Sequence, residues 1–151
     1  MPHLKRSAAD MVASARARIE EVETEAAIAL LGDPGVVIVD IRDPRERARS
    51  GQIPGSFHAP RGMLEFWVDP ESPYFKPVFG QDKRFLLHCA SGWRSALAVA
   101  TLQDMGFPAA HLKDGFTDWV AKGGPVERAP ASDHPDQATA LADRKSDSDV
   151  R

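Results

Sequence analysis

The stretch Phe85-Leu86-Leu87-His88-Cys89-Ala90-Ser91-Gly92-Trp93-Arg94-Ser95 decides how the rest of the chain is interpreted. An apolar run ends at Cys89, which is the only cysteine of the chain, and an alanine-rich helical pattern follows Ser95. This order of strand, loop and helix places several backbone N–H groups and the positive end of a helix dipole around one thiol. We expect such a thiol to ionise readily, because these groups stabilise the thiolate.

Strands and helices alternate on both sides of this stretch. Residues 36–41 form a nearly continuous β-branched run, and residues 84–88 form a second apolar run, both typical of strands buried on two faces. Shorter strands complete the pattern and are expected at 18–22, 57–59 and 109–112. The pattern predicts an α/β fold, with a doubly wound, mostly parallel sheet and helices on both faces. Ligands of such folds bind beyond the carboxyl ends of the strands, where Cys89 and Asp40 lie.

Three segments are expected along the chain. Residues 1–17 contain a short appended helix with a thin apolar face, and Ser7 is its predicted N-cap. Residues 18–128 contain the strands and helices of one α/β domain. Residues 129–151 are rich in Pro, Ser, Asp and Ala and have almost nothing to bury, so we expect a disordered tail there.

The composition argues against several kinds of partner. The 151 residues carry a formal net charge of -3, which gives no reason to expect nucleic acid. No apolar run approaches the ~20 residues that a membrane span needs, and the basic N-terminus lacks the apolar core of a secretory signal. One cysteine cannot form an internal disulfide, which favours a reducing cytoplasm. The five histidines lie far apart without ligand spacing, so we expect no metal and no cofactor.

The loop after Cys89 is suited to hold a negative charge. The main-chain N–H groups of Ala90, Ser91 and Gly92 can turn inward as an anion-binding nest. Arg94 adds a permanent positive charge, and Ser95 can cap the following helix. A cysteine considered alone is more often a small buried apolar residue, but such a residue needs none of these groups. We therefore interpret Cys89 as a nucleophile. The residues expected to surround the charge are Ala90, Ser91, Gly92, Trp93, Arg94 and Ser95.

The segment from Cys89 to Ser95 resembles the active-site loop of single-domain rhodaneses, which are sulfurtransferases. The resemblance extends over about residues 19–127. Gln52 stands where the family usually has His, and Asp114 stands where its closing signature has the first Gly. Three further segments resemble family motifs: 39–46 the D-x-R-x-x-x-E segment, 51–56 the G-H-I-P-G-A/S turn, and 114–125 the G-G-x-x-x-W…G-x-P signature.

The resemblance implies a rhodanese-like fold and transfer of a sulfane sulfur. The thiolate of Cys89 would attack a small anionic donor such as thiosulfate, sulfite would leave, and the enzyme would carry a persulfide. A small thiol, a protein thiol or cyanide would then accept the outer sulfur. The nest would hold the persulfide anion, Arg94 would attract the donor or shape the loop, and a partly exposed Trp93 would shape the access of the acceptor.

Residues outside the loop are also candidates for this site. Arg61 follows a stretch that approaches the same edge of the sheet, where it either helps to bind an anionic donor or is simply exposed. Asp40 and Arg42 point to one side of their strand, and we expect structural roles for them, pairing with Glu46 or bracing the cysteine loop. His88 is expected to be a buried hydrogen-bonding residue and not a base.

Loop length discriminates between the alternatives. The spacing is C-x4-R, whereas related phosphatases and arsenate reductases of this fold have C-x5-R, which wraps a tetrahedral oxyanion. The shorter loop is sized for a sulfur atom, and no general acid for a phosphatase stands out. A second alternative is a sulfur carrier or interaction module without catalytic activity. The intact Cys89 and Arg94 argue against an inactive domain, but they are compatible with a carrier whose acceptor is a protein.

Overall fold

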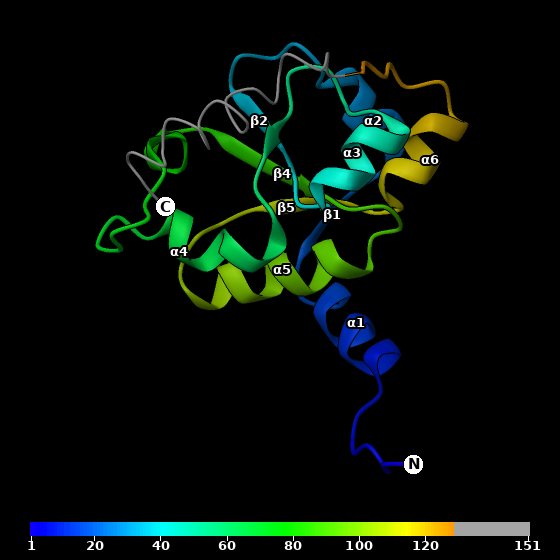
Figure 1. Ribbon diagram of the computed structural model, residues 1–151, viewed down its shortest axis with the longest axis vertical. Coiled ribbons are helices and arrows are strands. Elements are labelled where there is room, and N and C mark those ends of the chain that lie inside the picture. The colour runs from blue at the N-terminus through cyan, green and yellow to red at the C-terminus, as the bar shows by residue number, and fades with distance from the viewer. Residues whose placement is uncertain (129–151) are drawn as a thin grey trace.

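A parallel sheet forms the centre of the computed structural model, which describes residues 1–128 (Figure 1). The strand order within these residues is β1-β5-β4-β2-β3, and every neighbouring pair is parallel. The predicted α/β fold with a parallel sheet is therefore confirmed. The expected disordered tail, 129–151, lies outside the described residues. The strands are β1 (Glu20–Val22), β2 (Val36–Asp40), β3 (Phe57–His58), β4 (Arg84–His88) and β5 (Ala110–Leu112).

Helices cover both faces of the sheet. Leu86 and Leu87 are neighbours on β4, and because side chains alternate along a strand they belong to two separate apolar cores. The core around Leu87 includes residues of α4 and α5, and the core around Leu86 includes residues of α2 and α6. The helices are α1 (Ala8–Arg16), α2 (Thr24–Ala29), α3 (Pro44–Ser50), α4 (Leu64–Val68), α5 (Trp93–Asp104) and α6 (Gly115–Ala121), with 3-10 turns η1 (Arg61–Met63) and η2 (Pro77–Gly80).

Helix α1 packs against α5. It begins at the predicted N-cap Ser7, whose side chain and that of Asp10 form a capping box. Val12 and Ala15 of α1 are buried in a small apolar cluster with residues of α5. The N-terminal helix therefore covers the outer side of the helix that follows the cysteine loop. Among residues 1–128, no helix has the length and apolar character that crossing a membrane requires.

Candidate active site

Cys89 directly follows β4, at the carboxyl end of the parallel sheet, and α5 begins four residues later. Gly92 between them has a φ of 95°, in the left-handed region that favours glycine. A Cβ at this position would overlap the main-chain carbonyl oxygen of Lys113. Close packing against the segment that follows β5 therefore requires glycine in the cysteine loop.

Two main-chain N–H groups point at the sulfur. The N–H of Gly92 lies 3.1 Å from Cys89 Sγ, and the N–H of Ser95 lies 3.4 Å from it. Cys89 itself is fully buried. The nest was predicted from Ala90, Ser91 and Gly92, but in the structure Gly92 and Ser95 donate to the sulfur.

The first turn of α6 holds the other side of the loop. The N–H of Phe116 donates to the carbonyl oxygen of Cys89 at 2.9 Å, and that of Thr117 donates to the carbonyl of Ala90 at 3.0 Å. N–H groups in the first turn of a helix have no partner within the helix, so they are available for such bonds. Fixing these carbonyls on α6 leaves the opposite side of the loop, with its N–H groups, facing the sulfur.

Ser95 does not cap α5, contrary to the prediction. The N-cap is Gly92, and no side chain of residues 1–128 caps this helix. Instead, Ser95 is fully buried, with its hydroxyl 3.5 Å from Cys89 Sγ and 2.8 Å from His111 Nδ1. The serine therefore contributes both its N–H and its hydroxyl to the surroundings of the thiol.

Arg94 points to α3 and pairs with Glu46. The guanidinium forms two bonds to the carboxylate, at 2.8 and 3.0 Å. The hydrogen bonds to Glu46 raise the pKa of Arg94, with a smaller contribution from nearby Cys89, and the same pair lowers the pKa of Glu46. The neighbouring Trp93 is about half exposed, as expected. The one arginine of the loop is thus already bonded to a carboxylate.

Asp40 and Arg42 pair with each other in the interior, and Glu46, their expected partner, bonds to Arg94 instead. Arg42 donates to both carboxylate oxygens of Asp40, and its Nη2 also donates to the carbonyl of Gly51 at 2.7 Å. Burial works to raise the pKa of Asp40, but the bonds from Arg42 outweigh it and hold this pKa well below its usual range. The pair therefore ties the end of β2 to the segment after α3.

His88 is a buried hydrogen-bonding residue in the structure. Its Nδ1 lies 3.1 Å from the carbonyl oxygen of Cys89, and its ring stacks on Phe116 at 5.9 Å. Its Nε2 lies 3.8 Å from a carboxylate oxygen of Asp40 and has no hydrogen-bond partner among residues 1–128. Burial lowers the pKa of His88, so the neutral ring is favoured.

The structure does not bring Arg61 to the cysteine loop. Its guanidinium pairs with Glu65 at 2.8 Å. It lines a hollow of about 320 Å³ between η1, α1 and α5, together with Arg6 and Arg18, and no residue from 89 to 95 lines this hollow. A role for Arg61 in binding a sulfur donor therefore stays a prediction.

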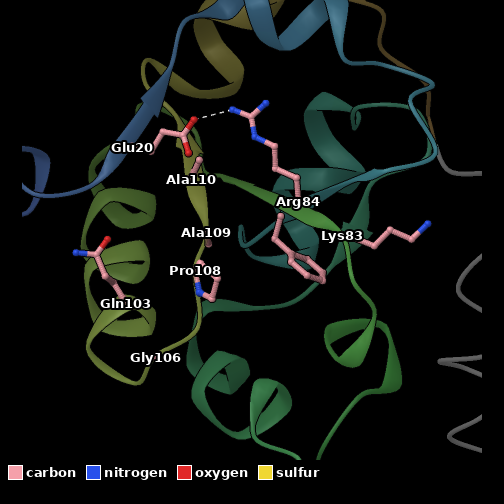
Figure 2. Close-up of a pocket in the computed structure, with 9 residues that line it drawn as sticks. Glu20, Lys83, Arg84, Gln103, Gly106, Pro108, Ala109 and Ala110 are labelled. Carbon is pink, nitrogen blue, oxygen red and sulfur yellow. Dashed lines mark hydrogen bonds and ion pairs between the residues drawn. The ribbon is translucent and has the colours of Figure 1, made fainter.

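A larger hollow, of about 580 Å³, lies at the other end of the sheet (Figure 2). It is lined by the first residues of β1, β4 and β5, and Arg84 pairs with Glu20 at its edge at 2.7 Å. Parallel sheets bind ligands at the carboxyl ends of their strands. The volume of this hollow would place a ligand site at the amino ends of the strands, whereas the strand direction places it at their carboxyl ends. Cys89 lies at the carboxyl ends.

Sequence reasoning missed three residues near the thiol. His111 on β5 bonds to Ser95, Glu21 on β1 bonds to His111, and Arg16 on α1 bonds to Glu21. They belong to three separate elements, and no local motif connects them. In the sequence, the only signal for His111 and Glu21 is that each is a polar residue within a short strand, which becomes informative once the strand order is known. Arg16, at the end of α1, has no such signal.

Comparison with known proteins identifies the family. Residues 23–122 match the Rhodanese-like domain. Thiosulfate:glutathione sulfurtransferase from Saccharomyces cerevisiae is 35% identical over 98 residues, covering 61% of this chain and 70% of that protein. Thiosulfate sulfurtransferase/rhodanese-like domain-containing protein 3 from Mus musculus is 30% identical over 97 residues, 60% of this chain and 62% of its own length.

One solved structure has higher identity. It is a protein of unknown function from Rhodopseudomonas palustris, described as a possible tyrosine phosphatase. It is 55% identical, with a TM-score of 0.80, and the match covers 84% of this chain and 99% of that one. The fold is therefore shared over nearly the whole described chain. The similar proteins carry two different descriptions, since this structure is called a possible tyrosine phosphatase and the yeast protein is named a sulfurtransferase.

Proposed function

The chain belongs to the rhodanese-like domain family, and on this premise we propose that it is a sulfurtransferase that carries the transferred sulfur as a persulfide on Cys89. One observation carries the proposal: the N–H groups of Gly92 and Ser95 lie 3.1 and 3.4 Å from Cys89 Sγ at the carboxyl end of the sheet. Donors fixed around a sulfur stabilise a thiolate before reaction and a persulfide anion after it.

The reaction consists of two displacements at sulfur. The thiolate of Cys89 attacks the outer sulfur of an anionic donor such as thiosulfate. A new S–S bond forms as the donor's S–S bond breaks, and sulfite leaves with the bonding electron pair. The thiolate of a small molecule or protein, or cyanide, then attacks the outer sulfur of the persulfide, and the Cys89 thiolate is released. The yeast relative is named for thiosulfate and glutathione, which supports these two classes of substrate.

The donor reaches Cys89 past the side chains at the start of α5. Cys89 is fully buried, whereas Trp93 is 48% exposed and the Arg94 side chain 43% exposed. Exposed side chains change rotamer rapidly, so these two residues can open the path without unfolding α5. We assign to Arg94 the first contact with the charge of the donor, in competition with Glu46.

A phosphatase is the second candidate, because the structure from Rhodopseudomonas palustris is described as a possible tyrosine phosphatase. Four residues separate Cys89 from Arg94, and the two loop donors already lie within hydrogen-bond distance of the sulfur. A phosphoryl group bound at the sulfur would bring three oxygen atoms that also need hydrogen-bond donors, so it requires a wider ring of donors than the sulfur alone. The loop size therefore supports sulfur transfer over phosphate-ester hydrolysis.

Intact-protein mass spectrometry after incubation with thiosulfate tests the proposal. We expect a gain of one sulfur atom, its removal by cyanide, and no gain in Cys89→Ser. Continuous production of thiocyanate or glutathione persulfide would identify an enzyme, whereas loading without turnover would identify a carrier. Hydrolysis of an aryl phosphate by the wild type, lost in Cys89→Ser and without any sulfur loading, would overturn the proposal.

A further inference from the structure

A line of hydrogen bonds runs from Cys89 to the surface at the edge of the sheet. Ser95 Oγ lies 3.5 Å from Cys89 Sγ and 2.8 Å from His111 Nδ1. His111 Nε2 lies 2.9 Å from Glu21 Oε2, which in turn accepts from Arg16 at 2.6 Å. Ser95 and His111 are fully buried, and about a quarter of the Glu21 and Arg16 side chains is exposed. Four elements, α5, β5, β1 and α1, each contribute one side chain to this line.

The protonation states fix the direction of each bond. Burial works to raise the pKa of Glu21, but the bond from His111 and the charge of Arg16 outweigh it and lower this pKa. The ionised Glu21 only accepts, so His111 Nε2 carries a proton. Burial lowers the pKa of His111, so its ring is neutral and Nδ1 accepts. The Ser95 hydroxyl therefore donates to Nδ1 and presents its lone pairs to the thiol of Cys89.

We propose that Ser95 and His111 together remove the proton from the Cys89 thiol when it becomes a nucleophile. The inference rests on Cys89 being the reacting thiol of the proposed function. The thiol passes its proton to Ser95 Oγ while the Ser95 hydroxyl passes its own proton to His111 Nδ1. The electron pair of the S–H bond stays on sulfur. The result is a thiolate that accepts hydrogen bonds from the N–H groups of Gly92 and Ser95, and an imidazolium at His111 that faces Glu21.

The charges around His111 suit this role. Glu21 on β1, Arg16 on α1 and Asp114 before α6 act on the ring. Two carboxylates against one guanidinium favour the imidazolium once a thiolate has formed nearby. Without a carboxylate, a buried imidazolium would be costly. Ser95 contacts the reacting sulfur and is a catalytic residue, whereas His111 acts through Ser95 and is a positioning residue.

Cys89 is the only cysteine in the chain, so its ionisation can be followed directly. The ultraviolet absorbance of the thiolate is measured against pH, with the spectrum of Cys89→Ser subtracted. We expect the midpoint to rise by about one pH unit in both Ser95→Ala and His111→Gln, a tenfold weaker ionisation. Sulfur loading from thiosulfate should slow by about the same factor at neutral pH and recover as the pH is raised, which a merely structural defect would not do.

His58→Gln is the matched control, because His58 on β3 bonds to the carbonyl of Arg42 and not to Ser95. Its midpoint should equal that of the wild type. Unchanged midpoints in Ser95→Ala and His111→Gln would overturn the inference. If His111→Gln does not fold, the midpoint of Ser95→Ala decides alone, since this variant loses only one oxygen atom and is expected to fold. A shifted midpoint in these variants, with no sulfur loading in the wild type, would refute the sulfurtransferase and leave the proton transfer standing.

Discussion

At Gly92 one residue meets three requirements of the cysteine loop. Its φ of 95° turns the chain into α5, its N–H donates to Cys89 Sγ at 3.1 Å, and its missing side chain leaves room for the carbonyl of Lys113. The first requirement is conformational and the last is steric. Gly106, just after α5, has a φ of 91°, and within the described part of the chain nothing lies within 4 Å of the position a Cβ would take, so it shares only the conformational requirement.

The two glycines therefore make a matched pair of substitutions. Gly106→Ala should lower the free energy of unfolding by about 1–2 kcal/mol, the cost of a left-handed alanine, and leave sulfur loading unchanged. Gly92→Ala should lower the free energy of unfolding further, because the added Cβ pushes the loop away from the carbonyl of Lys113. It should also load sulfur at least about tenfold more slowly, because the N–H of residue 92 then moves away from the sulfur. Urea denaturation and timed mass spectrometry measure both effects. Equal loading by the two variants would mean that the N–H of Gly92 does not position the thiolate.

Single residues differ in how far they could be predicted from sequence. The cysteine loop was predicted because its chemistry is carried by seven consecutive residues, 89–95. His111 follows Ser95 by 16 positions, and Glu21 is 90 positions away from His111. Their contact depends on β5 lying between β1 and β4. Strand order is set by packing of the whole sheet, so no local pattern announces these residues.

At the scale of elements, an ion pair between Glu46 and Arg94 joins α3 to α5. Glu46 belongs to the first turn of α3, where one carboxylate oxygen accepts the N–H of Asp43 in a capping box. The same carboxylate holds Arg94 of α5 by two bonds. The N-terminal cap of one helix thereby neutralises the arginine at the start of the other, next to the thiol.

Glu46→Gln separates these two roles, since glutamine keeps the capping box and loses the charge. With Arg94 no longer neutralised, the KM for thiosulfate should fall about fivefold at low ionic strength, in line with the ~1 kcal/mol of an exposed ion pair. Steady-state kinetics at two salt concentrations measure the effect, which should shrink in high salt because exposed charges are screened. A higher KM in the variant would mean that Glu46 holds Arg94 in its productive position. Asp43→Asn, which alters the cap of α3 and leaves Glu46 charged, is the control.

The start of α5 shows why a helix boundary was misjudged. Serine is a favoured N-cap, so Ser95 was expected there, but the helix begins at Trp93 and Gly92 is its N-cap. The N–H of Ser95 lies in the first turn, where no carbonyl of the helix can accept its hydrogen bond, and it donates to Cys89 Sγ. Here the sulfur takes the bond that a capping side chain would otherwise make.

For the molecule as a whole, the parallel direction of the main strands could be predicted from the sequence, and the order in which the strands pair could not. The apolar runs at 36–41 and 84–88 indicated buried parallel strands, and in a parallel sheet these place Asp40 and Cys89 at the same edge, as found. The pairing of β1 with β5 brings Glu21 beside His111, and it could not be derived from the alternation of strands and helices. The interior of this sheet contains several ionisable groups, and they make stability depend on pH.

The buried histidines set the direction of that dependence. Burial lowers the pKa of His58, His88 and His111 in the folded chain, whereas in the unfolded chain a histidine titrates near ~6.5. Just below that pH the unfolded chain binds more protons than the folded one, so the free energy of unfolding decreases as the pH falls. Asp40 acts in the same direction at lower pH, because its folded pKa is depressed and the unfolded carboxyl is protonated first, near ~3.9.

Stability should therefore be nearly constant from about pH 8 to 7 and fall as the pH drops below about 6.5, by at most ~1.4 kcal/mol per pH unit for each fully buried histidine. Urea denaturation across this range gives the slope. His88→Gln should reduce it, because glutamine fills the space between Cys89 and Asp40 without taking up a proton, whereas the exposed His3→Gln should leave it unchanged. Stability that increases as the pH falls from 7 to 5 would contradict the expectation, because it requires a group that binds protons more tightly in the folded chain than in the unfolded one. Loss of that increase in His88→Gln would mean that His88 is protonated in the folded chain beside Asp40.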